Sequence, residues 1–303
     1  MLSLFSRKLR RNQTVSPGRE RALPYLLVAP TVAVLLALSI YPLIYAVKVS
    51  LQAESDTGVR WTFQNFARLV SDRFFFSALA HTLVYAIIAL TVEFLLGLGL
   101  AVLLNLEMRG RSFFRAALLV PMMLPTVVVG VIWRLMLNPN FGAVNGTLKG
   151  FGIKTESLAW TARPMLAFAS VILVDIWQWT PFMFLILLAG LQAIPEEPYE
   201  AALIDGSSPW QTFRHVTLPL LKPAILIALL LRTMDLLRVF DQIFILTEGG
   251  PGSATETISL YIYRTAFRFG DFGYATAISF VLLILTNVIS LAYIRLLQRQ
   301  EAT

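Results

Sequence analysis

Six long apolar stretches constrain this chain more than any other feature of its sequence. A helix needs about 20 apolar residues to cross the hydrocarbon core of a bilayer, and each stretch reaches that length. They cover Leu23–Val49, Ser77–Leu106, Phe113–Leu137, Pro164–Gln192, Leu218–Thr247 and Tyr274–Leu297. Only 14% of the 303 residues are charged, which fits a surface that faces hydrocarbon. The sequence therefore predicts an all-α, polytopic membrane protein with six transmembrane helices.

Basic residues precede the first stretch and predict its orientation. They are Arg7, Lys8, Arg10, Arg11, Arg19 and Arg21. Such residues favour the cytoplasmic side, where anionic lipid headgroups attract them. Lipid contact also accounts for the net charge of +7, so no nucleic-acid partner is expected. We predict a basic cytoplasmic segment over residues 1–22, a six-span domain over 23–303, and both termini in the cytoplasm.

Several kinds of chemistry have no residues to support them in this sequence. The chain has no cysteine and only two histidines, His81 and His215, which are too few and too far apart for a histidine metal cluster. It has no G-x-x-x-x-G-K-[ST] loop to bind the phosphates of ATP, and no G-x-S-x-G or H-E-x-x-H motif. A membrane enzyme is therefore disfavoured, and transport is the expected activity.

The segment 195–219, between the fourth and fifth stretches, is too polar to span a bilayer and too long for a simple turn. Glu197 and Glu200 suit the positive N-terminal end of a short helix. Gly206 can end that helix with a positive φ, and one of the two serines that follow can cap a second helix starting at Pro209. Physical chemistry alone leaves two interpretations open: an ordinary interfacial connection, or a docking element for a cytoplasmic partner.

A spaced set of residues in this segment resembles a known family pattern. The set is Glu200, Ala201, Ala202, Gly206, Val216, Leu218 and Pro219. It is similar to the EAA-x3-G-x9-I-x-L-P loop of binding-protein-dependent ABC permeases, from which only Val216 departs. The resemblance implies the type I ABC importer permease fold and a loop that couples to an ATP-binding subunit. The implied coupling residues are Glu200, Ala201, Ala202, Asp205, Gly206, Leu218 and Pro219.

Further stretches resemble the carbohydrate-uptake permeases of the maltose and glycerol-3-phosphate type, and within them the MalF- or UgpA-like subunit. They include Trp133-Arg134, Asn138-Pro139, Trp177–Phe182, Thr247–Gly252 and Tyr261–Phe267. The resemblance covers nearly the whole chain from about Arg21 onward. It implies a multi-pass subunit of a prokaryotic cell (inner) membrane that carries a sugar-type substrate. It also implies three kinds of partner: a second homologous permease subunit, two ATP-binding subunits and an extracytoplasmic solute-binding protein. ATP and Mg would be bound by the partner ATPase, so no cofactor is expected in this chain.

Polar side chains in the fourth stretch are candidates for the substrate path. Trp177, Gln178 and Trp179 lie just before Pro181, which has no N–H and leaves a backbone carbonyl without its helical partner. Indole rings and an amide suit the apolar faces and the hydroxyls of a sugar. The alternative is that the tryptophans only pack against neighbouring helices, which is the commoner role of aromatic residues.

The fifth stretch carries four charges of alternating sign at intervals of three residues. Arg232, Asp235, Arg238 and Asp241 can interact in neighbouring pairs on a helix. We expect Arg232 and Asp235 to pair inside the bundle, while Arg238, Asp241 and Gln242 face a water-filled path. A wholly structural ladder of charges is the alternative.

The leading interpretation is an ABC importer permease that moves a sugar, oligosaccharide or polyol into the cell by alternating access. A phosphorylated or otherwise anionic sugar derivative is the first alternative, and a net-positive cavity would favour it. An ion-coupled secondary transporter is the second. Such a transporter needs no cytoplasmic docking loop, so the segment 195–219 argues against it.

Overall fold

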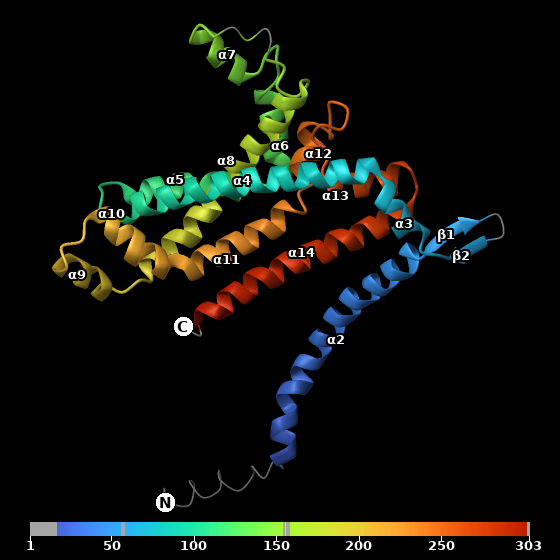
Figure 1. The fold of residues 1–303 in the computed structure, drawn as a ribbon, viewed down its shortest axis with the longest axis horizontal. Coiled ribbons are helices and arrows are strands. Elements are labelled where there is room, and N and C mark those ends of the chain that lie inside the picture. Colours follow the sequence, from blue (N-terminus) through green and yellow to red (C-terminus); the bar gives the residue numbers. More distant parts are fainter. Residues whose placement is uncertain (1–16, 56–57, 154, 156–157, 302–303) are drawn as a thin grey trace, which may run out of the picture.

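The computed structural model describes residues 17–55, 58–153, 155 and 158–301 of the chain. Most of the predicted basic segment 1–22, including Arg7 to Arg11, lies outside these residues. The described part is a bundle of long helices with shorter elements at its ends (Figure 1). The long helices are α2 (Pro17–Ser50), α4 (Arg73–Asn105), α8 (Pro164–Gln192), α11 (Leu218–Leu236) and α14 (Phe272–Glu301).

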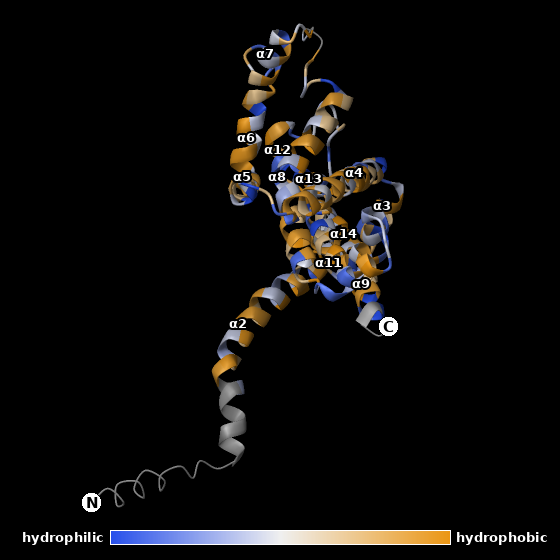
Figure 2. Cartoon of the chain, turned by 90° about the vertical axis from the view of Figure 1, so that its left-hand side faces the viewer, coloured by the Kyte–Doolittle hydropathy of each residue, from blue (hydrophilic) through white to orange (hydrophobic). Residues whose placement is uncertain are grey.

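Five helices of the described part are long and apolar enough to cross a membrane. They become six if the bent pair α5 (Arg111–Met123) and α6 (Thr126–Met136) is one broken span. Apolar residues cover most of the bundle, while polar residues gather at the connections between helices (Figure 2). The predicted all-α membrane fold is confirmed, and the predicted fourth span, Pro164–Gln192, has the bounds of α8.

The third predicted span, Phe113–Leu137, is not one straight helix. Its two halves are bent by 94° at the break between α5 and α6. Leu124 and Pro125 form this break, and both have extended backbone. The residue before a proline is pushed out of the helical region, and the proline itself has no N–H to continue the ladder. The stretch Phe113–Leu137 is therefore two helices with a break at Pro125, and not one continuous helix.

The fifth predicted span, Leu218–Thr247, is also interrupted. The helix α11 ends at Leu236, and the short helix α12 (Asp241–Leu246) follows after a break. This break separates Arg232, which lies on α11, from Asp241, which begins α12. The predicted ladder of four charges therefore does not lie on a single helix.

The core of the bundle is the crossing of α4 and α8. Gly97 of α4 lies directly against α8, because an added Cβ atom would be only 2.6 Å from the Cβ of Met183. Two turns further along α8, Gly190 allows a close approach of Leu221 and Ala224 on α11. Small residues allow membrane helices to pack at short range in this way. Two hydrophobic clusters surround this crossing, one of them centred on Tyr85, Val171 and Leu236.

A short β-hairpin follows α2 and was not expected from the sequence. Its strands, β1 (Gln52–Ser55) and β2 (Gly58–Trp61), are antiparallel. The Asn65 amide on α3 (Gln64–Ser71) holds the start of the hairpin by donating to the carbonyls of Ser50 and Gln52, both at 2.9 Å. The hairpin lies at the end of the bundle where α4 begins (Figure 1).

The Asp72 side chain ties three helices together at this end of the bundle. Its side chain caps α4 by accepting from the backbone N–H of Phe74 at 2.8 Å. It also accepts from the hydroxyl of Tyr261 on α13 (Ile258–Tyr263) at 2.6 Å and from that of Tyr274 on α14. Partial burial raises the pKa of Asp72, but these hydrogen bonds outweigh it and hold the pKa below its ordinary value.

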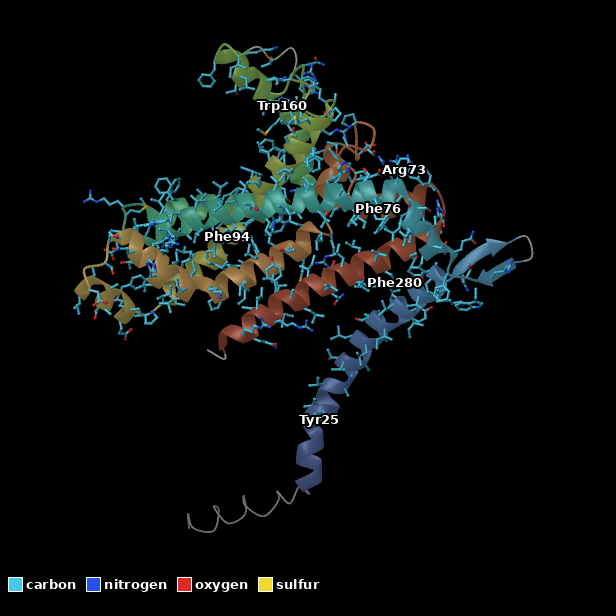
Figure 3. The ribbon with its side chains drawn as sticks, in the orientation of Figure 1. Tyr25, Arg73, Phe76, Phe94, Trp160 and Phe280 are labelled. Atoms are coloured by element: carbon cyan, nitrogen blue, oxygen red, sulfur yellow. The ribbon has the colours of Figure 1, made fainter. Side chains whose placement is uncertain are left out.

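The remaining elements are short and lie at the periphery of the bundle (Figure 1). The helix α7 (Ala143–Gly150) stands at the tip beyond α6 and is tied there by Trp160, whose indole N–H donates to the Asn145 amide oxygen at 2.7 Å (Figure 3). The π-helical turn η2 (Arg264–Arg268) leads from α13 towards α14. The helices α9 (Glu197–Ile204) and α10 (Pro209–Thr212) lie at the opposite end from the β-hairpin (Figure 1).

Candidate functional site

The segment 195–219 forms two short helices with a sharp corner, as predicted. Gly206 is at that corner with φ of +71°, the left-handed region that favours glycine. Ser208 caps the second helix through a capping box: its Oγ accepts from the Gln211 N–H, and its own N–H donates to the Gln211 Oε1 at 2.8 Å. From Pro209 the chain stays helical through the π-helical turn η1 (Phe213–Thr217) into α11. The second short helix is thus a direct extension of a spanning helix.

The loop presents most of its predicted coupling residues to the outside of the chain. Glu200, Ala201, Asp205, Gly206 and Pro219 are exposed, whereas Leu218 is half-buried and Ala202 is buried. Large apolar side chains are exposed beside them: Leu203 is 75% exposed, Ile204 87% and Trp210 67%. Such a cluster on the polar end of a membrane protein is typical of an interaction surface.

A buried group of charges joins the three central helices. Arg232 on α11 donates to both carboxylate oxygens of Glu93 on α4, at 2.7 and 2.9 Å, and also to Asp175 on α8. The guanidinium lies over the ring of Trp179, 5.0 Å from its centroid. The expected pair between Arg232 and Asp235 does not form. Two carboxylates from other helices are the partners instead, because Arg232 points into the bundle and Asp235 points out of it.

Glu93 is a functional candidate that the sequence interpretation missed. It is completely buried, and it is the only charged residue between Arg73 and Asn105 on α4. A lone carboxylate in the middle of an apolar span is itself a signal, because an unpaired charge there is costly and needs a partner. Asp175, the only acidic residue of α8, carries the same signal and points to the same partner.

A chain of amides runs beside the charge cluster and brings two predicted path residues together. Gln242 on α12 donates to the Oε1 of Gln178 on α8 at 2.8 Å. Gln178 in turn donates at 3.1 Å to the carbonyl of Leu124, which the break between α5 and α6 leaves free. Tyr85 completes the chain by donating to Gln242 at 3.3 Å. Gln178 and Gln242 are both buried, so these amides join α4, α8, α12 and the bent span.

Three of the other predicted path residues are exposed and stand apart from this chain of amides. Trp177 packs edge-to-face against Trp133 at a centroid distance of 5.6 Å and remains 40% exposed. Arg238 forms an exposed ion pair with Asp235 at 3.5 Å, just beyond the end of α11. Asp241 is also exposed, at the start of α12. The structure therefore separates the six candidates into a buried pair of glutamines, a half-buried Trp179 over Arg232, and three exposed side chains.

The described residues contain no group of three or more His, Asp or Glu side chains that could hold a metal ion. The charge cluster has two carboxylates, and Arg232 already fills the space between them. The charge cluster can therefore hold α4, α8 and α11 in fixed positions relative to one another.

Comparison with known proteins identifies the family. The family described as "Binding-protein-dependent transport system inner membrane component" matches residues 93–301. The trehalose/maltose transport system permease protein MalF of Thermococcus litoralis is 39% identical to this chain over 280 residues, which are 91% of the chain and 94% of that protein.

Two solved structures share the fold over most of its length. One is a bacterial ABC transporter involved in the import of the acidic polysaccharide alginate, with a TM-score of 0.80 and 26% identity over 92% of this chain and 96% of that one. The other is a bacterial alginate ABC transporter in complex with an alginate pentasaccharide-bound periplasmic protein, with a TM-score of 0.79 and 25% identity over 90% and 93%. The resemblance read from the sequence is therefore confirmed, and this chain belongs to the binding-protein-dependent transport system inner membrane components, the family of ABC importer permeases that includes carbohydrate-uptake members.

Proposed function

We propose that this chain is one of two membrane permease subunits of an ATP-driven importer that moves a sugar, oligosaccharide or polyol into the cell by alternating access. Its partners are a second homologous permease subunit, two ATP-binding subunits and an extracytoplasmic solute-binding protein. ATP and Mg bind to the ATPase partners, and this chain carries out no catalysis of its own. Residues 1–22 form a cytoplasmic basic segment, and residues 23–303 form the permease domain with both termini in the cytoplasm.

The loop 195–219 is the observation that carries this proposal. It combines a corner that needs glycine, an acidic first turn and exposed apolar side chains at one end of the bundle. Its second helix continues into α11, which is joined through Arg232 to α4 and α8. A movement of a docked partner at this loop would therefore reach the buried core of the bundle as a rigid-body displacement.

The substrate class rests on the proteins that share this fold and sequence. The relative from Thermococcus litoralis is named for trehalose and maltose, which are neutral sugars. An acidic saccharide is the second candidate, because the two similar transporter structures are those of alginate importers.

Gly206 provides the sharpest test of the coupling role. Gly206→Pro forces φ to about −65° where the loop needs +71°, and it removes the N–H that donates to the Leu203 carbonyl. We expect this variant to insert into the membrane but to lose co-purification with the ATPase, or to lose ATP hydrolysis stimulated by the loaded solute-binding protein. Glu200→Lys should weaken the same co-purification by reversing an exposed charge.

Gly146→Ala is the matched control. Gly146 lies within α7, far from the loop 195–219 (Figure 1), has no positive φ and has open space around its Cβ position. It should behave as the wild type in both measurements. Wild-type co-purification and wild-type stimulated hydrolysis in both Gly206→Pro and Glu200→Lys would remove this loop from the coupling mechanism.

A further inference from the structure

The buried charge cluster contains two acidic side chains and only one basic side chain. Glu93 on α4 and Asp175 on α8 both pair with Arg232 on α11, and the three side chains are 0%, 2% and 3% exposed. With both carboxyl groups ionised, two acids and one base would leave a net charge of −1 inside the bundle. A buried charge without compensation is so costly that the group usually becomes neutral instead. The cluster therefore needs one further positive charge.

The other charged side chains around the cluster lie outside it in the described part of the chain. Those on α4 and α11, on the turn after α11, and on the neighbouring helices α5, α6, α12 and α14 are exposed wherever the structure describes them, with Arg115 as the exception. The exposed ones are Arg73, Arg111, Arg134, Lys222, Asp235, Arg238, Asp241, Arg295 and Arg299. Arg115 donates to a carbonyl near the C-terminal end of α4, about 16 Å beyond Glu93 by the rise of an α-helix.

Two further titratable side chains of α4 add no charge to the cluster. Tyr85 faces all three members, but its phenol is neutral and its hydroxyl donates to Gln242 at 3.3 Å. His81 contacts the backbone carbonyl of Glu256 and lies about 18 Å before Glu93 along the helix. Burial of the cluster within this chain also keeps out any cation of a partner subunit. A proton is therefore the positive charge that remains.

The geometry of the two carboxyl groups provides a place for that proton. Nη2 of Arg232 donates to Oε1 of Glu93 at 2.9 Å and also to Oδ2 of Asp175, so the two acids meet at one nitrogen. At this corner their carboxyl groups are also within hydrogen-bonding reach of each other. Two ionised carboxylates repel at such a distance, because each has acceptors and no donor. One proton makes a donor of one group, and the pair then shares it.

We infer that Glu93 and Asp175 form a proton-binding site, which holds one proton at neutral pH and makes the cluster with Arg232 neutral. The proton belongs to the pair and not to a single member of it. In the unfolded chain both groups are ionised above about pH 5, so folding takes up this proton. Its contribution to stability is therefore present near neutral pH and is lost as the pH rises. The inference goes beyond the proposed function and does not depend on which substrate is carried.

Infrared spectroscopy detects the proton directly, because a protonated carboxyl group and a carboxylate absorb at different frequencies. Asp175→Asn and Glu93→Gln are each made in the complete transporter, and their spectra at neutral pH are subtracted from that of the wild type. Each difference should contain the carbonyl band of one protonated carboxyl group, since each variant has a single carboxylate opposite Arg232. Differences that contain only carboxylate bands would show that both acids are ionised, and the inference would be wrong.

The pH dependence of stability is the second measurement. Asp175→Asn replaces the shared proton by an amide N–H that can donate to Glu93, so this variant needs no proton to be neutral. The unfolding temperature of the complete wild-type transporter should fall relative to that of Asp175→Asn as the pH rises above neutral. Each pH unit favours loss of the one proton about tenfold. Glu93→Gln, which leaves Asp175 paired with Arg232, should show the same relative gain.

Glu256→Gln is the matched control, because Glu256 forms an ion pair with one arginine and no second acid. Arg264 donates to it at 2.7 Å, and the Glu256 side chain is 7% exposed. The substitution removes the carboxylate of a balanced pair and leaves Arg264 without its counter-charge. This variant should unfold at a lower temperature than the wild type, by an amount that stays constant above neutral pH.

The comparison of the three variants decides the question. A gain at high pH in Asp175→Asn and Glu93→Gln, but not in Glu256→Gln, supports the proton site. If the first two lose stability as Glu256→Gln does, by an amount that does not diminish as the pH rises, the wild-type cluster carries two ionised acids. Failure of both variants to assemble at any pH would also overturn the inference, because a cluster with one carboxylate would then be unstable.

Discussion

At the scale of single residues, the burial of Arg232 is tolerated only because two carboxylates pair with it, and their burial is tolerated only because Arg232 pairs with them. All three side chains are buried and come from three different helices. A buried ion pair contributes little net stability compared with apolar residues of the same size, because desolvation opposes the attraction. Removal of one member is different, since the remaining charges are then buried without a partner. The cluster therefore specifies how α4, α8 and α11 align, more than it adds to their affinity for one another.

Arg232→Met should reveal this dependence. The substitution leaves Glu93 and Asp175 buried without a cation, and we expect a destabilisation of about 3–5 kcal/mol. The measurement is thermal unfolding of the purified complex and the amount of complex recovered from membranes. The triple variant Arg232→Met, Glu93→Gln, Asp175→Asn should recover most of the lost stability, because it removes the charges together.

Arg68→Met is the matched control for an ion pair outside the core. Arg68 and Asp271 form an exposed pair at 2.7 Å, so the loss should stay below about 1 kcal/mol. If Arg232→Met unfolds at the same temperature as Arg68→Met, the buried cluster has no special role in holding the helices.

At the scale of elements, the crossing of α4 and α8 rests on Gly97. Gly97→Ala would place a methyl group 2.6 Å from the Cβ of Met183 and 3.0 Å from the backbone N of Phe184. Neither atom can rotate away, so the helices must separate. We expect a loss of about 1–3 kcal/mol, the usual penalty of overpacking, measured as a lower unfolding temperature in detergent.

Gly99→Ala lies two residues further along the same helix and serves as the control. It has nothing within 4 Å of its Cβ position and no positive φ, so alanine should be neutral or slightly stabilising there. Equal losses in the two variants would contradict the close-packing role of Gly97.

Helix existence could be predicted from the sequence, whereas breaks and contacts between helices could not. The apolar run Pro164–Gln192 starts with a proline at the first helical position, and the structure keeps both of its bounds. The bend at Pro125 could not be predicted because a proline can also lie within a continuous membrane helix. Whether the helix continues or breaks depends on the packing around the proline, here around Leu124. The corner at Gly206 was predicted because its cause is local.

In the candidate site, too, local features could be predicted from the sequence and contacts between helices could not. The pair Gln178 and Gln242 was named as part of one path, but the hydrogen bond between them depends on the break that starts α12. Arg232 was expected to pair with a neighbour three residues away, whereas its partners are 139 and 57 residues distant in sequence. Spacing along one helix says nothing about which other helix supplies a partner.

At the scale of the whole molecule, the arrangement of long helices predicts which surfaces lie on which side of the membrane. The helix α4 separates the β-hairpin from the helices α9 and α10 (Figure 1). Single cysteines at Ser55, Ser157 and Ser253 should therefore react in sealed cells with an impermeant thiol reagent, whereas those at Ser3 and Ser207 should not. Ser3 and Ser157 lie outside the described residues, so Ser55, Ser253 and Ser207 are the positions that test the described fold.

Permeabilised cells are the control for this experiment, since all five cysteines should then become reactive. Modification of Ser207→Cys in sealed cells would place the loop 195–219 outside and would overturn both the topology and the proposed docking of an ATPase.

The helix α2 has a consequence for how this protein is made. No residue of its most apolar window is buried by the rest of the described chain, whereas 61% of the corresponding window of α8 is buried. Because α2 leaves the ribosome before α8, and because lipid can surround it without contacts from other helices, it can settle in the bilayer before any later segment is made. The helix α8 cannot settle in the same way, because Asp175 has no cationic partner until Arg232 on α11 has been synthesised. Biogenesis should therefore pass through a stage in which the fourth span is present and held by the insertion machinery, and it is released only when Arg232 arrives.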